Sequence, residues 1–463
     1  MTDAANPTPK KEVKPVGTLE MVSYSMGNAA NSLIMLGTGT YLNFFWTDIA
    51  MIPLAAMGTI LSFARFLGIG TDILMGFLLD RTKNKHGKAR PWILWMALPM
   101  LISYLALFYV PNMSETGRIV YAFITYNLVA FFTMSALALP MQSLLALITN
   151  DPKKRLTMSM LNMSVGTLFQ ILGNMAVMPA INALGGGQQG YFRFFGILGV
   201  IGTALYLLVF FGTTERVTQE ESEEKKEEKI SVREVIRLYL ANKWWIIMTF
   251  FQGFSFLYPS FMAINMYYMT WVMGNPALMG PFQSIMSAAM LITLIVGTPI
   301  VPRIGKIYAS FLAMLLQFVG NFLPLFAPTS VPVIMIASAL RGAGPAILLG
   351  TNAAFMCDVI EYGEWKTGRR LEGLTFSIAG MGGKIGSALG GLVFAFLLAK
   401  GGYVGGATTQ TPQAINMIKI IFTWCHSFGS IACTILLFYL RKLDEQMPQI
   451  MADLAARKKS LAT

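Results

Sequence analysis

The chain alternates between long apolar segments and short polar connections along almost its whole length. Each apolar segment is near or above the roughly 20 residues that a helix needs to span a bilayer. The twelve segments have the approximate limits 22–48, 53–79, 91–111, 118–149, 157–183, 194–213, 244–273, 278–302, 306–327, 331–356, 374–400 and 413–440. Backbone polar groups in lipid need internal partners, and strands of a barrel would alternate in polarity, so continuous apolar runs predict helices. The pattern therefore predicts an all-α polytopic membrane protein with 12 transmembrane helices.

The basic residues of the connections predict the orientation. With the amino terminus inside, 28 Lys and Arg residues lie in the tails and connections of that side, and only Arg118, Arg193 and Lys400 lie on the other. Cytoplasmic connections of membrane proteins carry such an excess of positive charge. We therefore expect a multi-pass protein of the cell inner (plasma) membrane with both termini in the cytoplasm.

One long, highly charged connection divides the spans into six and six. It is predicted to include an interfacial helix near residues 232–240. The predicted parts are a cytoplasmic tail (1–21), a six-helix bundle (22–213), a cytoplasmic linker (214–243), a second six-helix bundle (244–440) and a cytoplasmic tail (441–463). Two six-helix halves around a central linker are the architecture of major facilitator transporters, in which substrate binds at the midplane between the halves.

Composition narrows the function. The 463 residues are 55% hydrophobic and 13% charged, with a mean hydropathy of +0.57, whereas soluble domains average about 25% charged residues. Spans and short connections leave no room for a soluble catalytic domain, so an enzyme is not expected. The net charge of +12 lies in orientation-setting connections, which argues against nucleic acid. We expect no metal or other cofactor, and as partners the lipid bilayer, a small-molecule solute and a coupling cation, with the protein acting as a monomer.

Four ionisable residues lie deep within spans: Arg65, Asp72, Arg341 and Lys384. A charge at mid-bilayer costs roughly 3 kcal/mol on insertion scales, so each is a functional candidate. Arg65 and Asp72 are seven residues apart, about 10 Å along one helix face, which is too far for a direct pair. Lys384 is the predicted partner of Asp72. Either this pair is a structural tie between the halves, or Asp72 carries a coupling proton or sodium ion.

The embedded charges also bear on the substrate. Three cations face one anion, so an anionic solute would supply the missing charge, with bidentate contacts from Arg65 or Arg341 and a point charge from Lys384. The alternative for Arg341 is that backbone carbonyls around the break at 342–345 satisfy it. Further polar candidates for substrate contacts are Asn31, Gln142, Asn162 and Tyr268. For these residues, helix–helix hydrogen bonds and packing are the competing roles.

The stretch CDVIEYGEWKTGRRLEG at 357–373 mixes charges of both signs on the predicted cytoplasmic side. Pairing with the basic connection after the second span would close that side. The predicted gate residues are Arg81, Lys88, Arg90, Asp358, Glu361, Glu364, Arg370 and Glu372. Single exposed pairs are weak, but a network of them could bias alternating access by a few kcal/mol. The alternative is a merely solvated connection.

Four motifs carry a resemblance to a known family. They are AR-x(6)-D at Ala64–Asp72, GKARPWIL at Gly87–Leu94, D-x-x-EYGEW-K-x-G-x-R-x-EG at Asp358–Gly373 and KIGSA at Lys384–Ala388. With these motifs the chain resembles the glycoside–pentoside–hexuronide:cation symporters, a sugar-transporting branch of the major facilitators, over nearly its whole length. The resemblance implies that Asp72 belongs to the cation site, that Lys384 lies near both cation and sugar, and that the charges of 357–373 form a gate.

The departures from that family's sodium-coupled, melibiose-type members are as informative. Where they have a second aspartate one turn before Asp72, this chain has Gly68. Their sugar-binding aspartates align with Ser32 and Ala138, and their helix 5 arginine with Met163 or its neighbour Asn162. The polar residues that remain for the cation site are Thr71 and Ser135.

Losing a carboxylate weakens a sodium site, which wants several oxygens. The sequence therefore favours proton coupling, and the missing sugar aspartates favour an acidic sugar such as a glucuronide. The alternatives are sodium-coupled symport of a neutral glycoside or pentoside, a lysolipid-type carrier, and a membrane sensor that does not transport.

Overall fold

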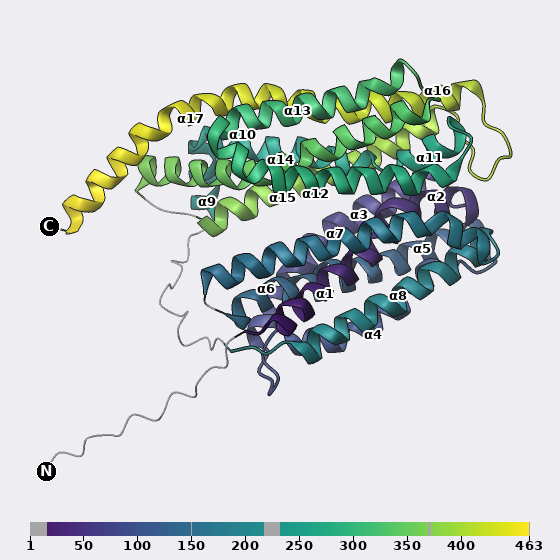
Figure 1. Cartoon of the computed structure of the whole chain (residues 1–463), viewed down its shortest axis with the longest axis horizontal. Helices are drawn as coiled ribbons and strands as arrows, with labels where there is room; N and C mark the ends of the chain where they lie inside the picture. Colours follow the sequence, from purple (N-terminus) through teal and green to yellow (C-terminus); the bar gives the residue numbers. More distant parts are fainter. Residues whose placement is uncertain (1–15, 150, 217–231, 369–371, 463) are drawn as a thin grey trace, which may run out of the picture.

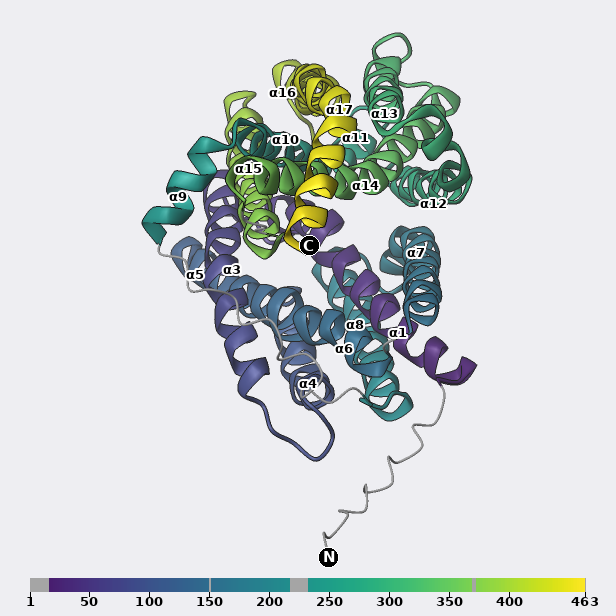
Figure 2. The same ribbon diagram turned by 90° about the vertical axis from the view of Figure 1, so that its left-hand side faces the viewer.

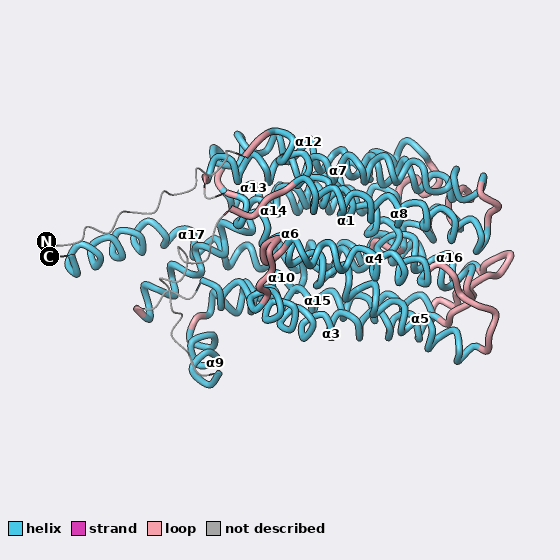
Figure 3. Tube along the Cα trace, turned by 90° about the horizontal axis from the view of Figure 1, so that it is seen from below, coloured by secondary structure: helices cyan, strands magenta, loops and turns pink. Residues whose placement is uncertain are grey.

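The computed structural model describes residues 16–149, 151–216, 232–368 and 372–462. These residues form helices joined by short connections, with no strand in any of the four ranges (Figure 3). The helices gather into two elongated groups that lie side by side, one from each half of the chain (Figures 1 and 2). Helix α1 begins, and helix α17 ends, at the same end of the molecule, which is called here the terminal end.

The amino-terminal group contains six spans, two of which change between α and π geometry. Its elements are α1 (Thr18–Met35), η1 (Leu36–Tyr41), α2 (Leu42–Phe44), η2 (Phe45–Ile49), α3 (Leu54–Arg81), α4 (Arg90–Leu107), α5 (Glu115–Ala130), η3 (Phe131–Leu137), α6 (Ala138–Ile148), α7 (Pro152–Ala183) and α8 (Gly187–Gly212). Elements α1 to η2 make the first span, and α5 to α6 make the fourth.

The carboxy-terminal group repeats this plan after a short helix, α9. Its elements are α9 (Val232–Ala241), α10 (Lys243–Phe261), α11 (Ile264–Trp271), η5 (Pro276–Leu278), α12 (Met279–Ile304), α13 (Lys306–Phe322), η6 (Leu323–Leu325), α14 (Val331–Thr367), α15 (Glu372–Lys400), α16 (Pro412–Ile420), η7 (Ile421–Cys425) and α17 (His426–Ala462). Helix α9 forms where the sequence predicts a helix, and it lies beside the start of α10 at the terminal end (Figure 3).

Eleven of the predicted spans correspond to described helical segments long and apolar enough to cross a membrane. The remaining span is also helical, from Thr18 to Ile49. It changes to π geometry after α1, and α1 carries polar residues such as Asn28 and Asn31. The predicted all-helical membrane architecture is confirmed.

Two helices run further than the sequence analysis placed them. Helix α14 continues to Thr367 and α17 to Ala462, so 37 residues make each about 55 Å long, against about 30 Å of hydrocarbon. The extension of α17 buries one face, because Leu443, Met447, Ile450 and Leu454 recur every three or four residues. This helical periodicity was readable in the sequence.

The two groups contact one another through paired helices. Helix α3 packs on α15, and α7 packs on α12. Along these contacts, Ser62 Oγ donates to the carbonyl of Ala388 (2.9 Å), and Ser284 Oγ, near the start of α12, donates to the carbonyl of Ile171 (3.0 Å). The α7–α12 approach is close enough that a Cβ on Gly280 would lie 2.7 Å from the Asn174 carbonyl oxygen. The α3–α15 contact carries three of the four embedded charges, Arg65, Asp72 and Lys384.

Candidate functional site

Asp72 of α3 is bound from both sides at the contact between the two groups. Its Oδ2 pairs with Lys384 Nζ of α15 at 2.5 Å, and its Oδ1 accepts a hydrogen bond from Ser135 Oγ at 2.6 Å. Ser135 Oγ lies 2.9 Å from Thr71 Oγ1. The predicted partnership of Asp72 with Lys384 is confirmed, and the four residues predicted for the cation site lie together.

Local helix geometry brings Ser135 to this position. Ser135 belongs to the π segment η3, within the fourth span, and is fully buried. A π turn inserts an extra residue into a helix and is frequent at functional sites. The side chains of Asp72 and Lys384 remain 33% and 38% exposed. The carboxylate is therefore held by two protein groups, Lys384 and Ser135, yet remains within reach of water.

The position that would hold a second carboxylate is open. Gly68 lies one turn before Asp72 on α3, and a Cβ placed there would meet no other atom within 4 Å. A side chain would therefore fit at residue 68 without a steric clash, and the site lacks a second carboxylate only because glycine occupies this position. The site offers one carboxylate and two hydroxyls, and Lys384 already occupies one carboxylate oxygen.

Arg65, like Asp72, contacts α15 from α3, but its partner there is a backbone carbonyl. Its Nη1 donates to the carbonyl of Ser387, and a Cβ on Gly391 would lie 2.8 Å from that nitrogen. The two charges of α3 thus form two contacts with α15, one to a lysine and one to a carbonyl. The predicted role of Arg65 in binding an anionic substrate stays a prediction, with one of its donors already engaged.

Arg341 lies inside the carboxy-terminal group, 1% exposed. Its Nε donates to the Gly320 carbonyl (3.2 Å), its Nη2 donates to the Phe422 carbonyl (2.8 Å), and its guanidinium carbon lies 3.9 Å from the centre of the Phe422 ring. Tyr268 stacks on Phe422 at 3.8 Å and donates its hydroxyl to the Pro328 carbonyl. The described partners are thus backbone carbonyls of α13 and η7, while Nη1 is buried with no described hydrogen-bond partner. They do not come from residues 342–345, where the expected break is absent and α14 is continuous.

The remaining predicted substrate residues belong to the amino-terminal group. The Asn162 carbonyl accepts from Asn28 Nδ2 (2.9 Å), which joins α7 to α1, and Asn162 Oδ1 is buried with no described partner. Gln142 is exposed and Asn31 half-buried. None of the described hydrogen bonds connects these side chains to Asp72, and their substrate contacts stay predictions.

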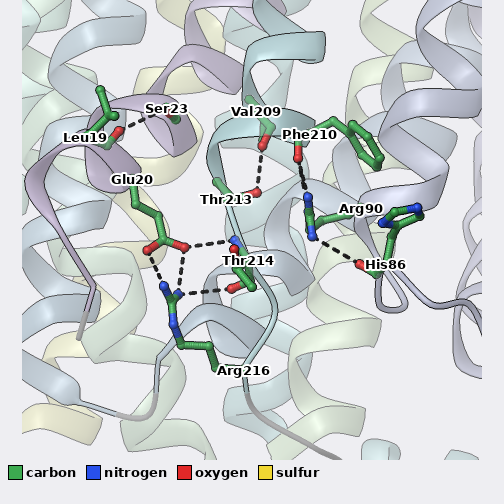
Figure 4. Close-up of polar contacts among 10 residues, drawn as sticks. All are labelled: Leu19, Glu20, Ser23, His86, Arg90, Val209, Phe210, Thr213, Thr214 and Arg216. Atoms are coloured by element: carbon green, nitrogen blue, oxygen red, sulfur yellow. Dashed lines mark hydrogen bonds and ion pairs between the residues drawn. The ribbon is translucent and has the colours of Figure 1, made fainter. Parts of the chain in front are cut away.

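The basic connection after α3 is anchored within its own group. The carboxylate of Glu215 accepts from the backbone N–H groups of Lys88 (2.7 Å), Ala89 and Arg90 (both 2.9 Å) at the start of α4, where the helix dipole favours a negative charge. Arg90 Nη2 donates to the Phe210 carbonyl at 2.6 Å (Figure 4).

A neighbouring ion pair fixes the same segment. Arg216 binds both carboxylate oxygens of Glu20 at 2.7 Å, and the Thr214 N–H donates to the same carboxylate (Figure 4). These contacts attach residues 213–216 to the start of α1 and to α4. The sequence analysis missed Glu20 and Glu215 as anchors, because only their places at span ends marked them.

Asp358, one of the predicted acidic gate residues, also pairs within its own group. Asp358 is 6% exposed and lies 2.5 Å from Lys306 Nζ at the start of α13, which is itself 3.1 Å from Asp444 of α17. The expected pairing of Asp358 with the basic connection is therefore not what the structure has. A buried carboxylate takes the nearest cation, and Lys306 had been assigned only an orientation role.

The other predicted gate residues lie on several elements of both groups. Arg81 covers the ring of Phe77 at 3.9 Å. Glu361 and Glu364 lie on the α14 extension. Arg370 and the side chain of Glu372 lie outside the described residues. The gate network stays a prediction.

A polar cluster not anticipated from sequence joins the groups at the end opposite the termini. Thr47 Oγ1 and Tyr403 OH both donate to Asp48 at 2.6 Å, Thr47 lies 2.8 Å from the Tyr267 hydroxyl, and Trp271 Nε1 donates to Tyr403 OH at 2.9 Å. We call these five residues the far-end cluster. The described cross-group hydrogen bonds thus lie along the α3–α15 and α7–α12 contacts and at this end.

The chain is similar in sequence to known transporters. The chain matches the family model described as MFS/sugar transport protein over residues 23–445. It is 32% identical to the isoprimeverose transporter of Lactiplantibacillus pentosus over 94% of this chain and 91% of that one. It is 27% identical to the glucuronide carrier protein homolog of Escherichia coli (strain K12) over 95% and 96%.

A solved structure agrees in fold. The xylose transporter XylE from E. coli matches with a TM-score of 0.61 at 10% identity, covering 91% of this chain and 97% of that one. The resemblance drawn from the sequence motifs is confirmed, and the protein is a multi-pass membrane transporter and not an enzyme. Because the family model spans nearly the whole chain, this protein belongs to the MFS/sugar transport protein family.

Proposed function

We propose that this protein is a proton-coupled symporter that moves an anionic glycoside, such as a glucuronide, across the membrane by alternating access. The observation that carries the proposal is the Asp72 carboxylate, shared between Ser135 and Lys384 across the contact of the two groups. A carboxylate in this position can exchange its basic partner for a proton.

Proton and substrate binding are coupled because the proton competes with Lys384 for Asp72. When Asp72 takes a proton, it no longer neutralises Lys384, and an unpaired ammonium at the half-buried contact between the groups is costly. A carboxylate on the substrate would replace the lost counter-charge. Proton and substrate therefore each favour the binding of the other. After both leave, the Asp72–Lys384 pair re-forms and neutralises the empty carrier.

The oxygen set favours a proton over sodium. A sodium ion would draw on Asp72, Thr71 and Ser135, but one carboxylate oxygen already contacts the Lys384 ammonium at 2.5 Å. A second cation at that oxygen would meet like-charge repulsion. A proton needs only one free lone pair and no coordination shell.

The second candidate is symport of a neutral glycoside. It is favoured by the carbonyl partners of Arg65 and Arg341, which reduce the need for a substrate anion. Relatives named for isoprimeverose and for a glucuronide both align along the chain, so the names do not choose between the two substrates.

Uptake into membrane vesicles tests the proposal. With an imposed inward proton gradient, labelled phenyl glucuronide should accumulate, and neutral phenyl xyloside should compete poorly. Asp72→Asn should abolish accumulation while exchange of internal for external substrate persists, because a neutral amide cannot cycle a proton. Accumulation in Asp72→Asn at the wild-type level would refute proton coupling through Asp72. Uptake of the xyloside with no competition by the glucuronide would move the assignment to the neutral class.

A further inference from the structure

The carboxy-terminal group contains a cavity of about 240 Å³ that the coupling site does not use. It lies between α10 and α14, with walls from α12, α13 and α17. Aromatic and aliphatic side chains make most of its lining, and none of its lining residues is charged. For comparison, an apolar cavity of about 150 Å³ is enough to hold benzene. The space therefore suits an uncharged, ring-sized group.

The wall residue Phe256 connects this cavity to the coupling site. Phe256 of α10 packs on α15 so closely that a Cβ on Gly383 would lie 2.9 Å from its ring. Gly383 directly precedes Lys384, the partner of Asp72. A substrate held at Lys384 and a group held against Phe256 would thus lie on adjacent parts of one helix.

The cavity faces the amino-terminal group. Viewed along the bundle, α12, α14 and α15 lie toward that group, whereas α13 and the first part of α17 lie on the far side (Figure 2). The lining residues Phe256, Met290 and Leu349 are 47%, 37% and 46% exposed, and they come from α10, α12 and α14. Their exposure is consistent with an opening toward the contact of the two groups, where substrate is proposed to bind.

A few polar atoms are available within the apolar lining. Ser430 Oγ donates to Gln317 Oε1 at 2.8 Å on the far wall. Asn352 Oδ1 is buried with no hydrogen-bond partner. A buried acceptor without a partner costs about 1–3 kcal/mol, so a ligand carrying one donor would gain from meeting it. Apolar walls with one or two convergent polar groups are typical of small-molecule sites.

We infer that this cavity is a subsite for the aglycone of the transported glycoside, and that it selects an uncharged ring with a hydrogen-bond donor. The inference rests on the proposed function, because it assumes that the sugar lies near Lys384. It adds that the carboxy-terminal group contributes specificity for the non-sugar part of the substrate.

Binding to the purified full-length protein tests the subsite separately from transport. The probes are methyl and phenyl glucuronide, with methyl and phenyl xyloside as the neutral pair, titrated calorimetrically. In whichever of the two pairs binds, the phenyl glycoside should bind at least about tenfold tighter than the methyl glycoside, because its phenyl ring is transferred from water into the cavity. A 4-hydroxyphenyl probe should bind tighter still, and Asn352→Leu should remove that increment.

Two substitutions change the cavity in opposite directions. Leu349→Trp fills it and should collapse the phenyl-over-methyl ratio toward one, whereas Met290→Ala enlarges it and should raise the affinity for a naphthyl glycoside. The matched control is Ile336→Trp, on the same helix α14 and 56% exposed but outside the lining, which should leave the ratio unchanged.

The outcomes separate the two proposals. An equal affinity for methyl and phenyl probes in both pairs, or a ratio that survives Leu349→Trp, overturns the subsite. If methyl glycoside uptake by vesicles persists in that case, the proposed symport still stands. A ratio lost in Leu349→Trp and kept in Ile336→Trp supports the subsite even where accumulation fails. Displacement of the phenyl probe by lysophospholipid but not by methyl glycoside would assign the cavity to an amphiphile and overturn the inference.

Discussion

At the scale of single residues, the charges buried in the spans separate into two kinds. Asp72 and Lys384 pair across the groups and remain partly exposed, whereas Arg341 is enclosed and bound by carbonyls. Asp72 and Lys384 can therefore change partners while the helices stay packed, whereas a change of partner at Arg341 would disrupt the packing around it. The chemistry of coupling is therefore concentrated on one carboxylate.

The open position at Gly68 gives a direct prediction about the coupling ion. Gly68→Asp adds a second carboxylate one turn from Asp72, where a Cβ meets nothing within 4 Å. A second carboxylate supplies oxygens that sodium prefers. We expect wild-type uptake to be independent of sodium and that of Gly68→Asp to be stimulated several-fold by it, measured as initial rates at fixed pH. Gly68→Asn, which matches the aspartate in size, is the control and should show no stimulation. Sodium-dependent uptake by the wild type would contradict the prediction.

The embedded residues also show how far sequence reasoning reaches. The Asp72–Lys384 pair was predictable, because a lone buried acid must find a cation and few lay at its depth. The partners of Arg65 and Arg341 were not, because a backbone carbonyl exists at every residue and has no sequence signature. Ser135 was recognised only by resemblance, since the π turn that aims it leaves no hydropathy signal.

At the scale of elements, the terminal end is formed by α14 and α17, which are long enough to extend beyond the membrane. Trp365 of the α14 extension donates to Asp453 of α17 at 2.9 Å, and Arg457 donates back to the Trp365 carbonyl at 2.7 Å. Lys306 joins α13 to both helices through Asp358 and Asp444. The predicted spans were correct, but these extensions were not placed, because their charges resemble those of a connection.

The ion pair of Lys306 should contribute to stability more than to gating. Lys306→Met leaves Asp358 buried and unpaired, which should lower the free energy of unfolding by about 3 kcal/mol. Thermal unfolding of the solubilised protein measures the loss. Lys306→Met with Asp358→Asn should recover part of it, because the only carboxylate then left without Lys306 is Asp444, which is 37% exposed.

The control for this measurement is the exposed pair between Arg441 and Glu445, whose side chains are 50% and 60% exposed. Arg441→Gln should change stability by less than about 0.5 kcal/mol. A Lys306→Met variant as stable as the wild type, but with altered uptake, would instead return Asp358 to a gating role.

At the scale of the whole molecule, alternating access requires contacts at one end to break while those at the other form. The described cross-group bonds lie along the α3–α15 and α7–α12 contacts and in the far-end cluster, away from the termini. The two groups are therefore held together at the far end in this structure. The sequence could not reveal this, because Asp48, Tyr267 and Tyr403 are separated by more than 130 residues from one another.

Tyr403→Phe tests whether the far-end cluster sets the conformational balance. The change removes the hydroxyl that donates to Asp48 and accepts from Trp271. Losing a hydrogen bond to a charged group costs about 2 kcal/mol, or about thirty-fold in an equilibrium. The population open at the far end should rise accordingly.

Spin labels measure this change. They are placed at Met113→Cys and Phe326→Cys, on far-end connections of the two groups, in a background without native cysteines. The distance between the labels should be longer in Tyr403→Phe. Tyr308→Phe, at an exposed tyrosine near the terminal end, removes the same atom and should leave the distances unchanged. Unchanged distances in Tyr403→Phe would mean that helix packing between α7 and α12, and not the cluster, holds this end closed.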